Sequence, residues 1–222
     1  MHHMGEMIQL TSEDEHLLTA YQATPKDTAK GGIVILQEIF GLTSHIRRVT
    51  DQYAEQGYLA IAPSLFDRVQ ADIILDYSDI DTGRSIMMGL DQNEVITDIK
   101  ASVGAAQTAG NVAVIGYCWG GAMADLAACR VKIDAAVAYY GRMIVDWLDE
   151  QPGCPTIYHF GANDPYIPQD IIEKISNGRP DHPSYVYAEA GHGFNCDERE
   201  EFEPESAKLA LDRTLEFLGR VL

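Results

Sequence analysis

Basic residues are scarce in this 222-residue chain, which has 16 Lys and Arg against 34 Asp and Glu and a formal net charge of −18. A field of that sign repels phosphate backbones and anionic lipid, so nucleic acids and membrane surfaces are unfavourable partners. No apolar run approaches the ~18 residues that a membrane-spanning helix needs. The first ten residues also lack the apolar segment of a secretory signal. We therefore expect a cytoplasmic protein without membrane or nucleic-acid partners.

Cysteine is scarce as well, with four residues and no Cys-x-x-Cys pair. Because no secretory signal is visible, the expected compartment is reducing and disulfides are not expected. Each cysteine is by default a small buried apolar side chain, and only the surroundings of Cys118 indicate chemistry. Residues 1–6, which begin Met-His-His, are predicted to be disordered or a remnant of an added tag. Neither a metal site nor a cofactor is expected.

The remaining composition fits one globular domain covering residues 1–222. Apolar residues make up 46% of the chain, enough for a sizeable core at this length. Short apolar runs that stop at Gly or Pro predict buried strands of a parallel sheet. We predict eight strands, near residues 7–11, 16–23, 33–36, 59–62, 112–115, 135–138, 156–160 and 184–187. About five helices are predicted, near residues 44–56, 92–108, 120–129 and 168–176 and from Pro204 to the C-terminus.

Strands that alternate with helices predict a mostly parallel sheet with helices on both faces, which is an α/β fold. Ser44 is expected to cap the first helix. The last helix is expected to bury a stripe formed by Leu211, Leu215, Leu218 and Leu222. The stretch 67–91 has no clear period and is too long for an ordinary connection, so we predict a lid or binding loop there.

One motif carries chemistry, because Gly116-Tyr117-Cys118-Trp119-Gly120 stands between a buried strand and a helix rich in small residues. This is the nucleophile-elbow pattern with cysteine in the serine position. The turn is so tight that the neighbouring positions must lack bulk, and the following helix directs its N-terminus at the sulfur. Cys118 is therefore the predicted nucleophile, and the backbone N–H of Trp119 is a predicted oxyanion donor. The alternative is a structural cysteine in a glycine-rich turn.

Two further side chains follow in the order that this motif requires. Asp164 follows the strand near 156–160, and His192 follows the strand near 184–187. Open α/β sheets place their sites at such carboxyl ends. His192 would move the proton, and Asp164 would hold its tautomer. Taken alone, an Asp-Pro pair is commonly a turn former and a histidine between glycines is commonly a surface residue.

Several segments, in order along most of the chain, are similar to the dienelactone hydrolase family of α/β-hydrolases. They are Gln37-Glu38-Ile39-Phe40-Gly41, Gln56-Gly57-Tyr58-Leu59-Ala60, Ala62-Pro63-Ser64-Leu65-Phe66, Gly116-Tyr117-Cys118-Trp119-Gly120-Gly121, Tyr139-Tyr140-Gly141 and Ala190-Gly191-His192-Gly193-Phe194. The resemblance implies that Glu38 accepts the thiol proton when substrate arrives, and that the Ile39 N–H is the second oxyanion donor. Burial at a strand end fits this role for Glu38, because desolvation raises a carboxyl pKa. The alternative to this role is that the Glu38 carboxylate is paired with an arginine or exposed to solvent.

The resemblance implies hydrolysis of a small ester or lactone by a Cys-Asp-His triad, in a monomer or weak homo-oligomer. The family's dienelactone enzymes hold the substrate carboxylate with arginines, one of them four residues after the catalytic histidine. Cys196 stands at that position here. Arg84 is the candidate anion-binding residue, and Arg68 is the weaker one. A non-catalytic or redox-sensing protein on the same scaffold is the alternative function.

Overall fold

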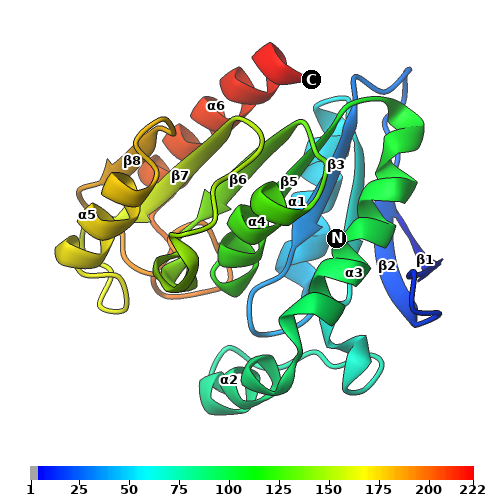
Figure 1. Cartoon of the computed structure of the whole chain (residues 1–222), viewed down its shortest axis with the longest axis horizontal. Helices are drawn as coiled ribbons and strands as arrows, with labels where there is room; N and C mark the ends of the chain where they lie inside the picture. Colours follow the sequence, from blue (N-terminus) through cyan, green and yellow to red (C-terminus); the bar gives the residue numbers. More distant parts are fainter. Residues whose placement is uncertain (1–4) are drawn as a thin grey trace. The chain divides into compact units, whose positions relative to one another are not determined.

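The computed structural model describes residues 5–222 and has an α/β-hydrolase fold (Figure 1). It confirms the predicted sheet of eight mostly parallel strands, in the order β1-β2-β4-β3-β5-β6-β7-β8. The strands are β1 (Glu6–Thr11), β2 (Leu17–Ala23), β3 (Gly32–Leu36), β4 (Leu59–Pro63), β5 (Val112–Tyr117), β6 (Ala135–Tyr139), β7 (Thr156–Gly161) and β8 (Ser184–Tyr187). The helices are α1 (Ser44–Glu55), α2 (Ile80–Gly89), α3 (Gln92–Ala106), α4 (Trp119–Arg130), α5 (Gln169–Gly178) and α6 (Pro204–Val221).

Short 3-10 helices complete the list, at Leu65–Arg68, Gln107–Ala109 and Arg142–Trp147. Of residues 1–6, predicted to be disordered or a remnant of an added tag, residues 1–4 lie outside the described residues. Glu6, by contrast, is the first residue of β1. Among residues 5–222, no helix has the length and apolar character that a membrane crossing requires. The chain divides into two compact units at Val114 and Ile115, within β5.

The first unit contains the N-terminal hairpin and the first parallel pair of strands. β2 is antiparallel to both β1 and β4, and β3 is parallel to β4. All five residues of β3 are buried, which explains its unbroken apolar sequence. Helices α1 and α3 cover opposite faces of these strands (Figure 1). Thr43, not Ser44, caps α1, because Thr43 is extended and its side chain accepts a hydrogen bond from the Ile46 N–H.

The second unit contains the parallel strands β6, β7 and β8. Helices α4 and α5 lie on one face of these strands and α6 lies on the other (Figure 1). The predicted leucine stripe of α6 is wrong in detail, because only Leu218 of the four is buried and Thr214 is buried instead. The Thr214 hydroxyl lies 2.8 Å from the Tyr139 hydroxyl and 3.1 Å from His159 Nε2. A buried polar network therefore fixes this helix together with apolar contacts.

The stretch 67–91, predicted to be a lid or binding loop, contains α2. This helix has one buried residue, Gly83, among its ten. A helix that buries so little has no need of an amphipathic stripe, which is why its sequence lacks a helical period.

Candidate active site

Cys118 stands at the turn between β5 and α4, which has the geometry of a nucleophile elbow. Its backbone has φ 55° and ψ −117°, a conformation that non-glycine residues rarely adopt. A Cβ atom on Gly116 would overlap the carbonyl oxygen of Gly120, so only glycine fits at that position. The Cys118 N–H donates to the Tyr139 carbonyl (3.0 Å), which joins the turn to β6. The strand, turn and helix predicted from the sequence are therefore all present.

The three side chains predicted as a triad meet within the second unit. His192 Nε2 lies 3.1 Å from Cys118 Sγ, and His192 Nδ1 lies 2.7 Å from Asp164 Oδ2. The His192 and Asp164 side chains are 9% and 0% exposed, so their hydrogen bond is shielded from water. This is the relation of nucleophile, base and orienting acid that acyl transfer requires.

Asp164 is held by backbone groups on the side away from His192. Its Oδ1 accepts hydrogen bonds from the N–H groups of Tyr166 (2.8 Å) and Ile167 (3.1 Å). Asn163 joins this loop to the one that carries His192, because its N–H donates to Ala190 and its side-chain amide donates to Ala188. These bonds fix the direction of the carboxylate and leave Oδ2 for the imidazole.

The protonation of His192 depends on both neighbours. Burial lowers its pKa, but the charge of a Cys118 thiolate and the hydrogen bond to Asp164 more than offset this and raise the pKa to about 10. Once Cys118 is a thiolate, His192 is therefore an imidazolium at neutral pH. The site stabilises that ion pair and can hold a proton ready for a leaving group.

Two aromatic rings, which sequence reasoning missed, flank the His192 imidazole. The Tyr140 ring lies 5.3 Å from it at 61°, and the Tyr166 ring lies 5.0 Å from it at 80°. Tyr140 has φ 38° and donates its N–H to the His159 carbonyl at 2.7 Å. Edge-on aromatic contacts of this kind restrict rotation of the imidazole. Two sequence clues were available, because Tyr140 lies in the family-like segment Tyr139-Tyr140-Gly141 and Tyr166 follows Asp164 by two residues.

The oxyanion and base candidates are divided between the two units. Trp119 is the first residue of α4, so its backbone N–H belongs to the positive end of the helix that begins beside Cys118. Glu38 and Ile39 follow β3 in the first unit, where their residues are 1% and 7% exposed. The burial of Glu38 rules out the exposed-carboxylate alternative, and its role as a proton acceptor stays a prediction.

The two candidate anion-binding arginines differ in their surroundings. The Arg68 guanidinium makes paired hydrogen bonds with Asp98 at 2.8 and 2.7 Å and with Asp14 at 2.7 and 3.1 Å. A carboxylate ligand would have to displace one of these partners, so Arg68 serves to join the hairpin to α3. Arg84 is an exposed residue of α2 and stays the candidate for an anionic substrate group.

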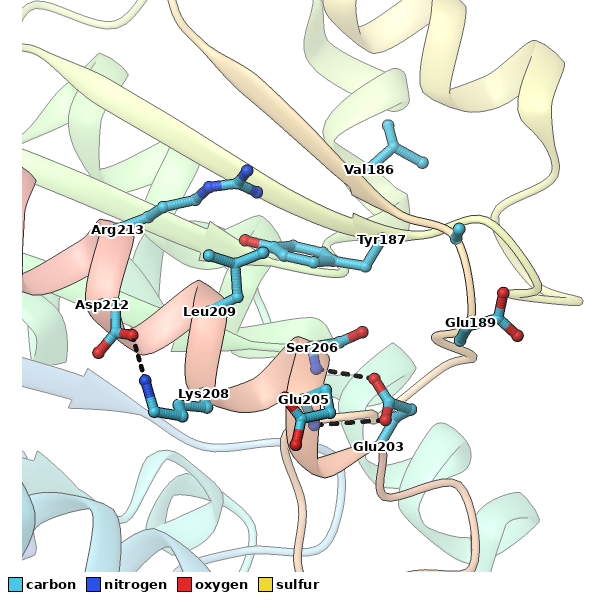
Figure 2. A pocket seen from close by; sticks show the side chains of 11 residues that line it. Val186, Tyr187, Glu189, Glu203, Glu205, Ser206, Lys208, Leu209, Asp212 and Arg213 are labelled. Carbon is cyan, nitrogen blue, oxygen red and sulfur yellow. Dashed lines mark hydrogen bonds and ion pairs between the residues drawn. The ribbon is translucent and has the colours of Figure 1, made fainter.

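The structure also contains features unrelated to the triad. Among residues 5–222, no group of three or more His, Cys, Asp or Glu side chains could hold a metal ion. A pocket of about 540 Å³ lies between β8 and α6, and none of its lining residues belongs to the triad. Figure 2 shows its polar edge, where the Glu203 carboxylate accepts hydrogen bonds from the N–H groups of Glu205 and Ser206.

Comparison with known proteins finds relatives that match nearly the whole chain. The profile of the Dienelactone hydrolase family matches residues 18–222. A carboxymethylenebutenolidase from Pseudomonas putida is 31% identical over 97% of both chains. A crystal structure named "Putative Dienelactone Hydrolase", from Klebsiella pneumoniae subsp. pneumoniae MGH 78578, has a TM-score of 0.83 and 32% identity, covering 95% of this chain and 98% of its own. The Pyrococcus furiosus esterase Pf2001, at 19% identity and a TM-score of 0.71, shares the fold over 98% of this chain and 92% of its own.

Proposed function

Because the chain belongs to the dienelactone hydrolase family, we propose that it hydrolyses a small carboxylic ester or lactone through a thioester on Cys118. The observation that supports this most strongly is the 3.1 Å separation of Cys118 Sγ and His192 Nε2, with Asp164 on the other imidazole nitrogen at 2.7 Å. A redox sensor has no need of a base that is oriented by a buried carboxylate. A binding protein has no need of a strained nucleophile turn.

The chemistry follows from the positions of these groups. The Cys118 thiolate attacks the carbonyl carbon, and the backbone N–H groups of Trp119 and Ile39 stabilise the oxyanion. His192 gives its proton to the leaving alkoxide, which departs as an alcohol and leaves a thioester on Cys118. His192 then removes a proton from water, and the resulting hydroxide attacks the thioester. The tetrahedral intermediate collapses to a carboxylic acid and the free thiol.

Before substrate binds, the proton is expected to reside on the Cys118 sulfur. A permanently exposed thiolate would oxidise readily, whereas a thiol attacks esters poorly. Glu38 resolves both demands by accepting the thiol proton only when a bound substrate displaces its carboxylate. The raised pKa of His192 belongs to the next state, in which Cys118 is a thiolate, and there His192 takes up a proton from solvent and becomes the imidazolium partner. Glu38 releases its own proton to solvent when the thiol is regenerated, so the cycle balances.

Hydrolysis of p-nitrophenyl acetate tests the proposed function. Iodoacetamide should stop turnover in proportion to the labelling of Cys118, and EDTA should leave the rate unchanged because no step uses a metal ion. Absence of turnover with a panel of small esters and lactones would favour the non-catalytic alternative. Turnover that persists after complete labelling of Cys118 would contradict the thioester mechanism.

The Glu38→Gln variant should slow acylation strongly while its alkylation by iodoacetamide changes far less, because iodoacetamide is not a substrate and does not displace the carboxylate. In the wild type, iodoacetamide should alkylate Cys118 more slowly at pH 6 than at pH 9, as expected of a thiol that is protonated at rest. A rate that is already maximal at pH 6 would indicate a resting thiolate–imidazolium pair instead. Full esterase activity in a folded Glu38→Gln variant would reduce Glu38 to a structural carboxylate.

A further inference from the structure

Helix α2 is unusual in how little of it is buried. Of its ten residues, all of which the structure describes, Gly83 alone is buried. Met88 on the same helix is 79% exposed. A helix that buries so little apolar surface gains little from packing, so the buried contact at Gly83 matters for its position.

The Gly83 contact is made with the loop that follows β3. A Cβ atom on Gly83 would overlap the carbonyl oxygen of Ile39 and would lie 3.3 Å from the Ile39 Cβ. Glycine destabilises a helix interior relative to alanine, and Gly83 does not have a positive φ that would require it. The close approach to Ile39 is therefore the physical reason for glycine at this position.

The segment that leads into α2 follows the same loop. The Leu75 N–H donates to the Phe40 carbonyl at 2.9 Å, and Ile74 forms an antiparallel bridge with Gly41. The Phe40 and Tyr77 rings meet edge to face at 4.9 Å. The loop is thus bound to the segment before α2 at Phe40 and Gly41, and to α2 itself at Ile39.

We propose that α2 is a positioning element for the Glu38–Ile39 loop and that Gly83 is its positioning residue. This inference rests on the proposed function, in which the Ile39 N–H is an oxyanion donor. The Ile39 carbonyl that contacts Gly83 and the Ile39 N–H are both attached to the Ile39 Cα. A substitution that displaces the carbonyl therefore also moves the N–H donor. An oxyanion donor is effective only when its N–H lies within hydrogen-bond distance of the position where the oxyanion develops.

Gly83→Ala tests the inference, with Gly89→Ala as its matched control. Both variants add one methyl group to a glycine of the same helix, but a Cβ atom on Gly89 meets nothing within 4 Å. Gly83→Ala should lower kcat for p-nitrophenyl acetate by ~10-fold or more with KM within ~3-fold, since loss of a whole donor costs ~10²–10³. Gly89→Ala should match the wild type. Alkylation of Cys118 by iodoacetamide forms no oxyanion and should be equal in all three proteins.

Equal kcat in folded Gly83→Ala and Gly89→Ala would overturn the inference, as would a parallel loss of kcat and alkylation in Gly83→Ala. If Gly83→Ala does not fold, amide hydrogen exchange of the wild-type protein tests the inference instead. A trifluoromethyl ketone that adds to Cys118 presents an oxyanion and should slow exchange of residues 38–43 and 80–89 together. Protection of 38–43 alone would overturn the coupling. An inactive wild type would instead refute the proposed function.

Discussion

Replacement of His192 by alanine is expected to lower kcat for p-nitrophenyl acetate by ~10³-fold or more, the scale of loss found for triad members. The imidazole is needed twice, to protonate the leaving alkoxide and to activate water. Its Nε2 lies 3.1 Å from Cys118 Sγ, within reach of the nucleophile for both steps. Steady-state kinetics with circular dichroism as a folding check would measure the effect.

Asp164→Asn should cost somewhat less than His192→Ala, because the imidazole remains but its preferred tautomer is lost. Asp170→Asn is the matched control, since Asp170 is an exposed residue paired with Lys174 on the surface of α5. The control should keep wild-type kinetics. Near wild-type turnover in His192→Ala, or equal effects at Asp164 and Asp170, would remove these residues from the mechanism.

The second large effect is expected at Cys118, where alanine should abolish the thioester pathway and lower turnover by a similar ~10³-fold or more. The chain provides matched controls in Cys129 and Cys154. Burial raises the pKa of Cys129 to about 12 and that of Cys154 to about 11, so both remain unreactive thiols at neutral pH. Alanine at either position should leave kcat unchanged. Equal losses at Cys118 and Cys129 would point to general destabilisation.

Much of the fold was predictable because its strands are buried on both faces. The runs at β3, β5, β6 and β7 are fully buried. β3, β5 and β6 have an unbroken apolar sequence, and β7 departs from it only at Thr156 and His159, so each strand can be located directly. The convergence of Cys118, Asp164 and His192 was predictable for a related reason, because each of the three follows a strand at its carboxyl end. Local sequence thus contained the information needed for both.

The remaining features depend on contacts between distant segments. The helix α2 lacks a period because one glycine makes its buried contact. Thr214 is buried because Tyr139 and His159, far away in the sequence, satisfy its hydroxyl. No pattern of apolar residues predicts a polar side chain at such a position, since its partners are chosen by the fold.

The same limit applies to the surroundings of the triad. Tyr140 and Tyr166 flank His192 from segments that are separated by 26 residues, so their convergence is a property of the folded loops. Arg68 was a candidate for anion binding because arginine commonly binds carboxylates. The structure gives it three carboxylate partners within the first unit, Asp14, Glu94 and Asp98.

The central claim, that Cys118 carries the acyl group, is tested most directly by mass spectrometry of the protein after brief incubation with p-nitrophenyl acetate and acid quenching. We predict one acetyl group per chain, on the peptide that contains Cys118, with Cys129, Cys154 and Cys196 unmodified. In the His192→Ala variant, acylated at high pH and then returned to neutral pH, the adduct should persist longer than in the wild type, because deacylation also needs the imidazole. Acylation of another residue, or turnover without any adduct on Cys118 under conditions that trap thioesters, would contradict the account.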